Sequence, residues 1–234
     1  MIADTLIGER PGPVRELVLP SPILSLDLLH RIAKALDEAR RQSLPLIVRS
    51  AHPIIFLAGA DLGEIGRLDA GSSREYARRG RAVLQRLHEL PAPVVAAVHG
   101  PCMGGGLDLA LACDAIVASP NARFGHPGAR RGLVTGWGGT VMLPWAAGSA
   151  LARKAFLACE SISAGQGHAA GFVALVTPDP VEGARAEALR LGSLHPRRLA
   201  LWRTLRSGRF IDRFRSCVVH HRRKQHPLGH REIS

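Results

Sequence analysis

Two glycine-rich stretches, residues 56–62 and 99–108, hold the residue types best suited to chemistry in this chain. Each follows a strand-like run, at residues 45–48 or 94–98, and each leads into an apolar stretch with helical spacing. Small residues let a carbonyl oxygen approach the backbone, and the first N–H groups of a helix have no partner within that helix. Two such donors aimed at one oxygen would stabilise an enolate or a tetrahedral anion. The two stretches therefore predict the two halves of an oxyanion hole.

Alternating strands and helices must position these stretches. Ser25 is a suitable N-cap for an amphipathic helix that runs to Arg41. Strands are predicted at residues 14–19, 45–48, 94–98 and 115–118, and further helices at residues 73–90 and 106–112. This alternation predicts an α/β fold.

An ordered series of further motifs makes the chain similar to a known family. The series comprises residues 24–27, 58–61, 104–106, 112–114, 124–127, 136–140 and 162–171. In order and spacing, from about Leu19 to Val176, it resembles the crotonase superfamily, the enoyl-CoA hydratase/isomerase proteins. The resemblance implies a crotonase-like spiral of repeated ββα units with a helical C-terminal region, assembled as a homotrimer or hexamer.

The resemblance also assigns roles at the predicted oxyanion hole. Ala60 and Gly105 match the two backbone N–H donors of the family. The CoA- and substrate-binding positions that it implies are Ala58, Gly59, Asp61, Leu62, Gly104, Gly128 and Trp137. The implied ligand is an acyl-CoA thioester, with coenzyme A as part of the substrate, no separate cofactor and no metal. Trp137 could cover the acyl pocket or fill the core, and packing is the interpretation that we favour.

Asp108 occupies the place of the first catalytic glutamate of the family. It can orient a water or move a proton, but its carboxylate would lie about 1 to 1.5 Å further back, a misplacement that can cost about a hundredfold in rate. An acid in the first turn of a helix is also favoured by the helix dipole alone. Catalysis is the interpretation that we prefer for Asp108.

The second catalytic glutamate of hydratases is replaced here by Gly128, which has no side chain to titrate. His126 is the nearest residue that could compensate, because imidazole can accept or donate a proton near neutral pH. It could instead be a hydrogen-bonded structural histidine. Glu64, close to the first glycine-rich stretch, is a weaker third candidate for an acid.

These residues predict an enzyme that stabilises a thioester enolate, most simply by hydration or dehydration of an enoyl-CoA. A single carboxylate, Asp108, fits double-bond isomerisation, thioester hydrolysis or decarboxylation as well. From another class, the chain could be a non-catalytic scaffold that binds CoA or RNA. Acyl chain length and pathway are not encoded in these motifs.

Composition agrees with one enzyme-sized core domain, which we place at residues 1–192. The chain has 234 residues, of which 46% are hydrophobic, and no apolar run long enough to span a bilayer. Its first residues lack the basic and apolar character of a secretory signal, so a cytoplasmic location is expected. The four cysteines are widely spaced, which favours small buried residues over zinc ligands or disulfides.

The remaining segment, residues 193–234, carries most of the formal net charge of +12. Its apolar residues recur at intervals that predict broken helices with an arginine-rich outer face, and disorder is expected after Pro227. Such a face could pack against neighbouring subunits while staying solvated, or bind the phosphates of coenzyme A. Nucleic acid is the less favoured partner, because no aromatic residues are interleaved for base stacking.

Overall fold

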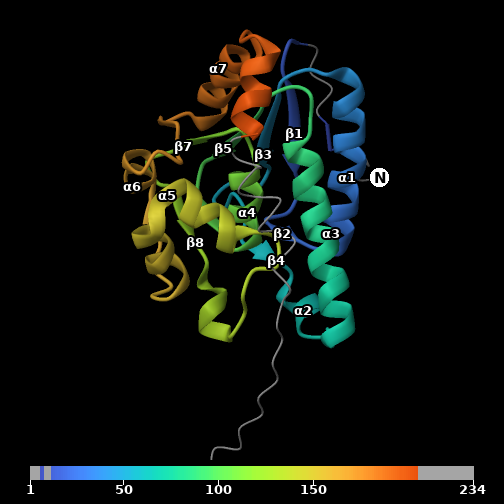
Figure 1. Cartoon of the computed structure of the whole chain (residues 1–234), viewed down its shortest axis with the longest axis vertical. Helices are drawn as coiled ribbons and strands as arrows, with labels where there is room; N and C mark the ends of the chain where they lie inside the picture. The colour runs from blue at the N-terminus through green and yellow to red at the C-terminus, as the bar shows by residue number, and fades with distance from the viewer. Residues whose placement is uncertain (1–5, 8–11, 205–234) are drawn as a thin grey trace, which may run out of the picture.

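The computed structural model describes residues 6–7 and 12–204. Its main sheet has five strands, every neighbouring pair parallel, in the order β1-β3-β5-β7-β10. The strands are β1 (Arg15–Leu19), β3 (Leu46–Ser50), β5 (Val94–Val98), β7 (Ala115–Ala118) and β10 (Leu175–Val176). Figure 1 shows the helices arranged around this sheet. Parallel neighbours require crossover connections, and the helices supply them.

Two smaller sheets hold the short strands. One pairs β2 (Ile23–Leu24) with β4 (Gly59–Ala60), and the other contains β6 (Pro101–Met103), β8 (Arg123–Gly125) and β9 (Ile162–Ser163). Each of the first four strands of the main sheet is followed by a short strand and then by helical structure. This is the repeated strand–strand–helix order that the family resemblance implies, and it confirms the expected fold.

The helices are α1 (Leu26–Gln42), α2 (Leu62–Ile65), α3 (Ala70–His88), α4 (Gly105–Ala112), α5 (Gly139–Phe156), α6 (Ala164–Ala169) and α7 (Pro180–Gly192), with a 3-10 turn at Pro127–Arg131. Ser25 caps α1 as predicted, by accepting a hydrogen bond from the Leu28 N–H. Helix α3 begins at Ala70 instead of the predicted Ser73. The reason is a capping box, in which Asp69 accepts from Ser72 N–H and the Ser72 hydroxyl accepts from Asp69 N–H.

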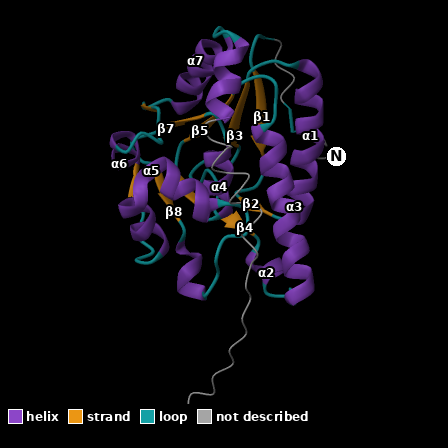
Figure 2. Ribbon diagram, in the orientation of Figure 1, coloured by secondary structure: helices purple, strands orange, loops and turns teal. Residues whose placement is uncertain are grey.

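Both faces of the main sheet are covered, which explains why its strands are apolar at nearly every position. Ile47, Val95 and Val117 pack with Ala184 and Ala188 of α7 on one face. The alternate residues of these strands join the larger core beneath α1, α3 and α4. Figure 2 shows α7 apart from the adjacent pair α1 and α3, with the strands between them.

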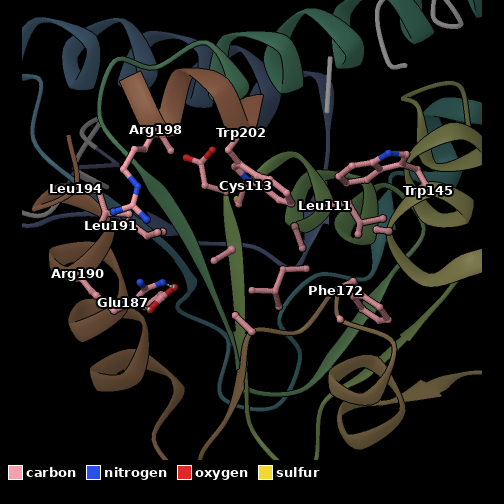
Figure 3. Close-up of a pocket in the computed structure, with 18 residues that line it drawn as sticks. Leu111, Cys113, Trp145, Phe172, Glu187, Arg190, Leu191, Leu194, Arg198 and Trp202 are labelled. Carbon is pink, nitrogen blue, oxygen red and sulfur yellow. Dashed lines mark hydrogen bonds and ion pairs between the residues drawn. The ribbon is translucent and has the colours of Figure 1, made fainter. Parts of the chain in front are cut away.

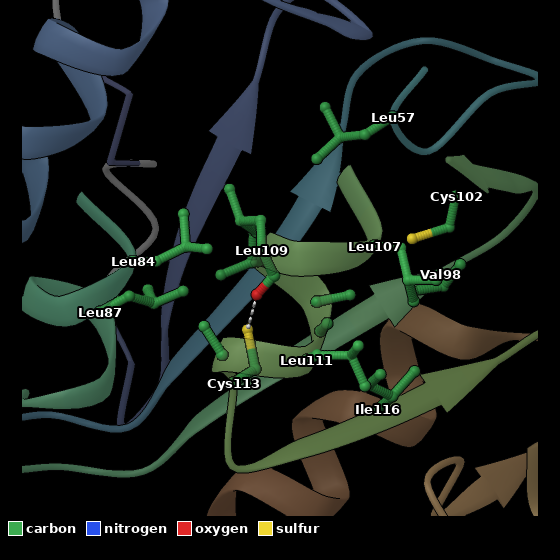
Figure 4. Packing of buried hydrophobic residues seen from close by; sticks show 14 of the residues in the cluster. Leu57, Leu84, Leu87, Val98, Cys102, Leu107, Leu109, Leu111, Cys113 and Ile116 are labelled. Carbon is green, nitrogen blue, oxygen red and sulfur yellow. Dashed lines mark hydrogen bonds between the residues drawn. The ribbon is translucent and has the colours of Figure 1, made fainter. Parts of the chain in front are cut away.

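Helix α4 lies in the centre of the larger core, and all eight of its residues are buried. Figure 4 shows Leu107 and Leu109 of this helix among side chains of α3 and the sheet. Burying one such leucine contributes about 1.5–3 kcal/mol. Cys102 and Cys113 are buried, as predicted, whereas Cys159 is half-buried and Cys217 lies outside the described residues. A helix this deeply buried holds its first turn in a fixed position.

Residues 196–204 form a further helical segment that is attached to the core. Arg203 donates to the Asp114 carboxylate at 2.9 Å through Nε and to the Ala92 carbonyl at 3.0 Å. The prediction of a separate basic region from residue 193 remains a prediction, and its part beyond residue 204, with the expected disorder after Pro227, lies outside the described residues. Within the described part of the chain, no helix is long and apolar enough to cross a membrane.

Candidate active site

The two glycine-rich stretches lie against each other where β4 meets the start of α4. A Cβ atom added at Gly59 would lie 2.9 Å from the Met103 carbonyl oxygen and 3.2 Å from the Gly105 nitrogen. The φ angle of Gly59 is +111°, a conformation that favours glycine. The backbone of Ala60 is thereby held close to the first turn of α4, whose leading N–H groups have no partner within the helix. This is the neighbourhood predicted for the two oxyanion donors.

Close packing requires glycine at both Gly105 and Gly106. A Cβ atom at Gly105 would lie 2.3 Å from Cζ3 of Trp137, and one at Gly106 would lie 2.4 Å from Cβ of Leu57. Trp137 itself is 3% exposed and stacks on Tyr76, with 5.8 Å between ring centroids. Trp137 therefore packs in the core, directly against the start of α4, and its role toward substrate remains a prediction.

Asp108 and His126 are brought together, although they come from different units of the fold. Asp108 is fully buried in α4, and its Oδ1 lies 3.0 Å from Nε2 of His126, without the alignment of a hydrogen bond. The imidazole is 5% exposed and stacks on Phe156 of α5, with 4.5 Å between ring centroids. An acid and an imidazole in contact can hold and transfer a proton. The two catalytic candidates from the sequence thus form one pair.

Thr135 and Gly139, which the sequence motifs did not indicate as part of the site, also contact the Asp108–His126 pair or leave space for it. The Thr135 hydroxyl donates a hydrogen bond to Oδ2 of Asp108. A Cβ atom at Gly139 would lie 2.0 Å from Oδ1 of Asp108 and 2.8 Å from Nε2 of His126. The glycine at the start of α5 therefore leaves the space that the acid and the imidazole share. The signal for Gly139 was its place in a glycine-rich turn, whereas Thr135 directly precedes that turn.

Helix α3 holds this turn in position. Arg81 donates to the Gly136 carbonyl at 2.8 Å, and Gly80 leaves room for the Trp137 ring, because a Cβ atom there would lie 2.1 Å from the indole nitrogen. The backbone N–H of Trp137 donates in turn to the Thr135 hydroxyl oxygen at 3.2 Å. One helix thus fixes both the indole beside Gly105 and the hydroxyl beside Asp108.

The acids that follow Ala60 are engaged locally. Asp61 caps α2 by accepting from Gly63 N–H at 2.7 Å and from Glu64 N–H at 3.1 Å. Both carboxylate oxygens of Glu64 accept from the Leu26 N–H, at 3.0 and 3.1 Å. Glu64, the third candidate for an acid, therefore binds the start of α1 through its carboxylate instead of the Asp108 pair. Ala58 and Leu62, by contrast, are exposed, as a CoA-facing stretch requires.

Burial raises the pKa of the Tyr76 hydroxyl, next to this loop. The nearby carboxylates of Glu64 and Asp61 raise this pKa further. Tyr76 therefore stays neutral across the working range of pH. Its ring supports Trp137 without adding a charge beside the start of α4.

Gly128 lies in the 3-10 turn and is partly exposed. A Cβ atom there would lie 3.4 Å from Cβ and from the carbonyl oxygen of Leu133, an ordinary contact distance. Packing at the Cβ position therefore does not require glycine at residue 128. The missing carboxylate is a departure in chemistry that local packing does not impose.

A cavity of about 440 Å³ opens elsewhere in the molecule, beside the helical segment 196–204 (Figure 3). Trp145, Phe172, Leu194, Arg198 and Trp202 are among the residues that line it. None of the predicted site residues belongs to its lining.

Comparison with known proteins gives a consistent assignment. The family model for enoyl-CoA hydratase/isomerase matches residues 19–194. Methylglutaconyl-CoA hydratase of Rattus norvegicus is 36% identical over 162 residues, which are 68% of this chain and 51% of that protein. Short-chain-enoyl-CoA hydratase of Clostridium acetobutylicum is 32% identical over 179 residues, 74% of this chain and 69% of that protein. The chain spans about half the length of the methylglutaconyl-CoA hydratases that it matches.

Solved structures agree with the sequence matches. DspI of Pseudomonas aeruginosa superposes with a TM-score of 0.78 at 28% identity, over 87% of this chain and 80% of that one. Enoyl-CoA hydratase of Bacillus anthracis gives a TM-score of 0.77 at 26% identity, over 92% and 91% of the two chains. With the fold, the ordered motifs and the family match all covering the same residues, the chain belongs to the enoyl-CoA hydratase/isomerase family of the crotonase superfamily.

Proposed function

We propose that this protein binds acyl-CoA thioesters and catalyses hydration of an enoyl-CoA and the reverse dehydration. The observation that carries the proposal is the meeting of β4 with the start of α4, one helical turn from Asp108. Relatives named as enoyl-CoA hydratases support the same chemistry. The substrate is a thioester and not a free acid, because the backbone donors suit a carbonyl oxygen that gains negative charge.

In this mechanism the N–H groups of Ala60 and Gly105 hold the thioester oxygen. When water adds to the β-carbon, the electrons of the double bond move toward that oxygen and form an enolate. Two fixed donors stabilise the developing charge, and losing one donor of this kind typically costs about 10²- to 10³-fold in rate. Coenzyme A enters as part of the substrate, and the scheme uses no other cofactor.

The proton is handled by Asp108 with His126. Their contact at 3.0 Å supports a shared role, in which the imidazole compensates for the carboxylate absent at Gly128 by holding Asp108 in place for both proton transfers. Asp108 takes the proton released by the attacking water and returns it to the α-carbon of the enolate. One acid can do both tasks because addition and protonation follow each other.

The second candidate is a reaction that needs one carboxylate only, such as double-bond isomerisation of an enoyl-CoA. The observation that favours it is Gly128, which leaves Asp108 as the carboxylate at the pair. Thioester hydrolysis and decarboxylation share this requirement. Product analysis separates all of them from hydration.

We further propose a homotrimer or hexamer in the cytoplasm. The family resemblance supports the assembly. The wide spacing of the four cysteines, which favours small buried residues over disulfides, supports a reducing compartment.

The experiment that tests the function follows the enoyl absorbance of crotonyl-CoA with and without the protein, and titrates acetyl-CoA by calorimetry. We expect hydration and saturable binding. Binding without loss of enoyl absorbance would favour the one-carboxylate reactions, which are then checked by chromatography of the products. No heat and no thermal shift at millimolar acetyl-CoA would refute thioester binding.

A further inference from the structure

Asp108, the acid on which the proposed function depends, has no exposed surface, whereas Thr135 is partly exposed. The Thr135 hydroxyl donates to Oδ2 of Asp108. The other oxygen, Oδ1, faces His126 and the Cα atom of Gly139. Thr135, which is partly exposed and contacts the carboxylate, therefore links the buried Asp108 to the exposed side of the turn.

The hydrogen bonds of this hydroxyl leave one position open. A threonine hydroxyl has one proton to donate and two lone pairs that accept. Its proton is directed at Asp108, and one lone pair accepts from the Trp137 N–H at 3.2 Å. The second lone pair remains to accept a proton from a bound water or substrate. This arrangement is what a proton relay requires.

We propose that the Thr135 hydroxyl is the group through which Asp108 exchanges a proton with bound water or substrate. The inference rests on the proposed function and names a residue that touches the reacting atoms. It also explains how Asp108 can act where the family has a longer glutamate. Aspartate is one methylene shorter than glutamate, and an intervening hydroxyl extends its reach by one O–H···O hydrogen bond, about 2.7 Å.

The relay balances in both steps of hydration. In the first step, the water O–H bond breaks, its oxygen bonds to the β-carbon, and its proton passes to Thr135 Oγ as the threonine proton passes to Asp108. The π electrons move to the thioester oxygen and form the enolate. In the second step, the threonine proton passes to the α-carbon, and Asp108 returns its proton to Thr135. The net change is the addition of one water, with no change in oxidation state of the enzyme.

The test compares Thr135→Val, which keeps the shape but loses the hydroxyl, with Thr135→Ser, which keeps the hydroxyl. Thr177→Val, at a threonine away from the pair, is the matched control. Two rates are measured on each protein: hydration of crotonyl-CoA, and exchange of the α-hydrogens of butyryl-CoA with D₂O by mass spectrometry. Butyryl-CoA has no double bond to hydrate, so exchange reports proton transfer alone.

We expect Thr135→Val to lower kcat for hydration and the exchange rate by about 10²-fold or more, with KM changed little. Thr135→Ser should stay within about tenfold of the parent, and Thr177→Val should match it. If the parent protein exchanges the α-hydrogens of butyryl-CoA but does not hydrate crotonyl-CoA, the proposed hydration is refuted. The relay is then tested by the exchange rates of the variants alone.

The relay is overturned if Thr135→Val keeps the parent rates, or if Thr135→Ser is as slow as Thr135→Val. It is also overturned if the main change is a rise in KM, which indicates a structural role, or if the parent shows neither hydration nor exchange. Near-ultraviolet circular dichroism, to which Trp137 contributes together with the other two tryptophans, shows whether aromatic packing has changed.

Discussion

The predicted site has an oxyanion side, formed by β4 and the start of α4, and an acid side, formed by the residues around Asp108 and by Gly128. The two sides differ in how strongly packing fixes their residues. On the oxyanion side, packing leaves little choice, since Gly59, Gly105 and Gly106 each have a neighbour within 3.0 Å of where a Cβ atom would lie. On the acid side, Gly128 has ordinary contact distances, and a larger side chain meets no such barrier there. The backbone at the predicted oxyanion hole is thus constrained by packing, whereas packing at the Cβ position leaves residue 128 on the acid side free to vary.

This difference explains how the chain keeps the family fold while departing from the hydratase pattern of two glutamates. The positions of α4 and β4 depend on the buried core, which tolerates few changes. The acid side depends on a few side chains around Asp108, contributed by His126 just after β8, the turn before α5 and α5 itself. We expect changes in these side chains to alter the proposed reaction and to leave the proposed binding of CoA thioesters intact.

The largest effect is expected from Asp108→Asn, which keeps the volume but removes the proton acceptor. Crotonyl-CoA hydration should fall by about 10²- to 10⁴-fold. Affinity for acetyl-CoA, measured by calorimetry, should stay within about threefold, because the backbone donors are untouched. The control is Asp37→Asn on the exposed face of α1, where Asp37 pairs with Arg86. Hydration at the parent rate in Asp108→Asn would show that the acid side lies elsewhere.

A smaller effect is expected from Gly105→Ala, which places a methyl group against Trp137. The N–H donor is kept but must shift with the helix start, and a displacement of about 1 Å can cost about 10²-fold in rate. The free energy of unfolding should also fall by about 1–3 kcal/mol, measured by denaturant titration. Adding Trp137→Leu removes the colliding atoms and should restore part of the stability. Gly165→Ala, at a helical glycine with open space around it, should be neutral or stabilising.

The sequence predicts the parts of this site that depend on local pattern. Strands β5 and β7 begin and end at the predicted residues, because both faces of the sheet are buried and their sequences are continuously apolar. The start of α3 was predicted three residues late, since Asp69 and Ser72 resemble a loop until their capping box is seen. The ordered glycine motifs likewise predict the meeting of β4 and α4.

Tertiary contacts account for what the sequence did not predict. Thr135 and Asp108 are 27 residues apart, and their hydrogen bond depends on how α3 supports the turn before α5. Nothing in the local pattern distinguishes Thr135 from a surface threonine. Glu64 lies in the predicted region, but only the structure shows that its carboxylate caps the start of α1.

Gly139→Ala tests the acid side in the same way as Gly105→Ala tests the oxyanion side. The added methyl group would lie 2.0 Å from a carboxylate oxygen of the buried Asp108. Overpacking of this kind should lower the free energy of unfolding by about 1–3 kcal/mol, measured by denaturant titration. Hydration should fall while binding of acetyl-CoA persists. Unchanged stability would mean that the pair can move apart, and that Gly139 does not fix its geometry.

The smallest effect is expected from Gly128→Glu, which returns a carboxylate to the acid side. Space at the Cβ position allows the side chain, so the fold should be retained. We leave Asp108 unchanged in this variant, because a longer acid would be forced against Gly139 in a buried site. Crotonyl-CoA hydration should rise by about tenfold or less, because the existing relay already supplies a proton path.

Ala129→Glu controls for the added charge in Gly128→Glu, since Ala129 is the exposed next residue of the same 3-10 turn. It should leave hydration at the parent level, because charge alone near the turn does not transfer a proton. If Gly128→Glu raises hydration far more than tenfold, the parent lacks the second acid that hydration needs, and isomerisation by Asp108 alone becomes the better assignment. If both variants lose hydration while stability is kept, the turn must stay uncharged for substrate to bind, and the acid side is then as constrained as the oxyanion side.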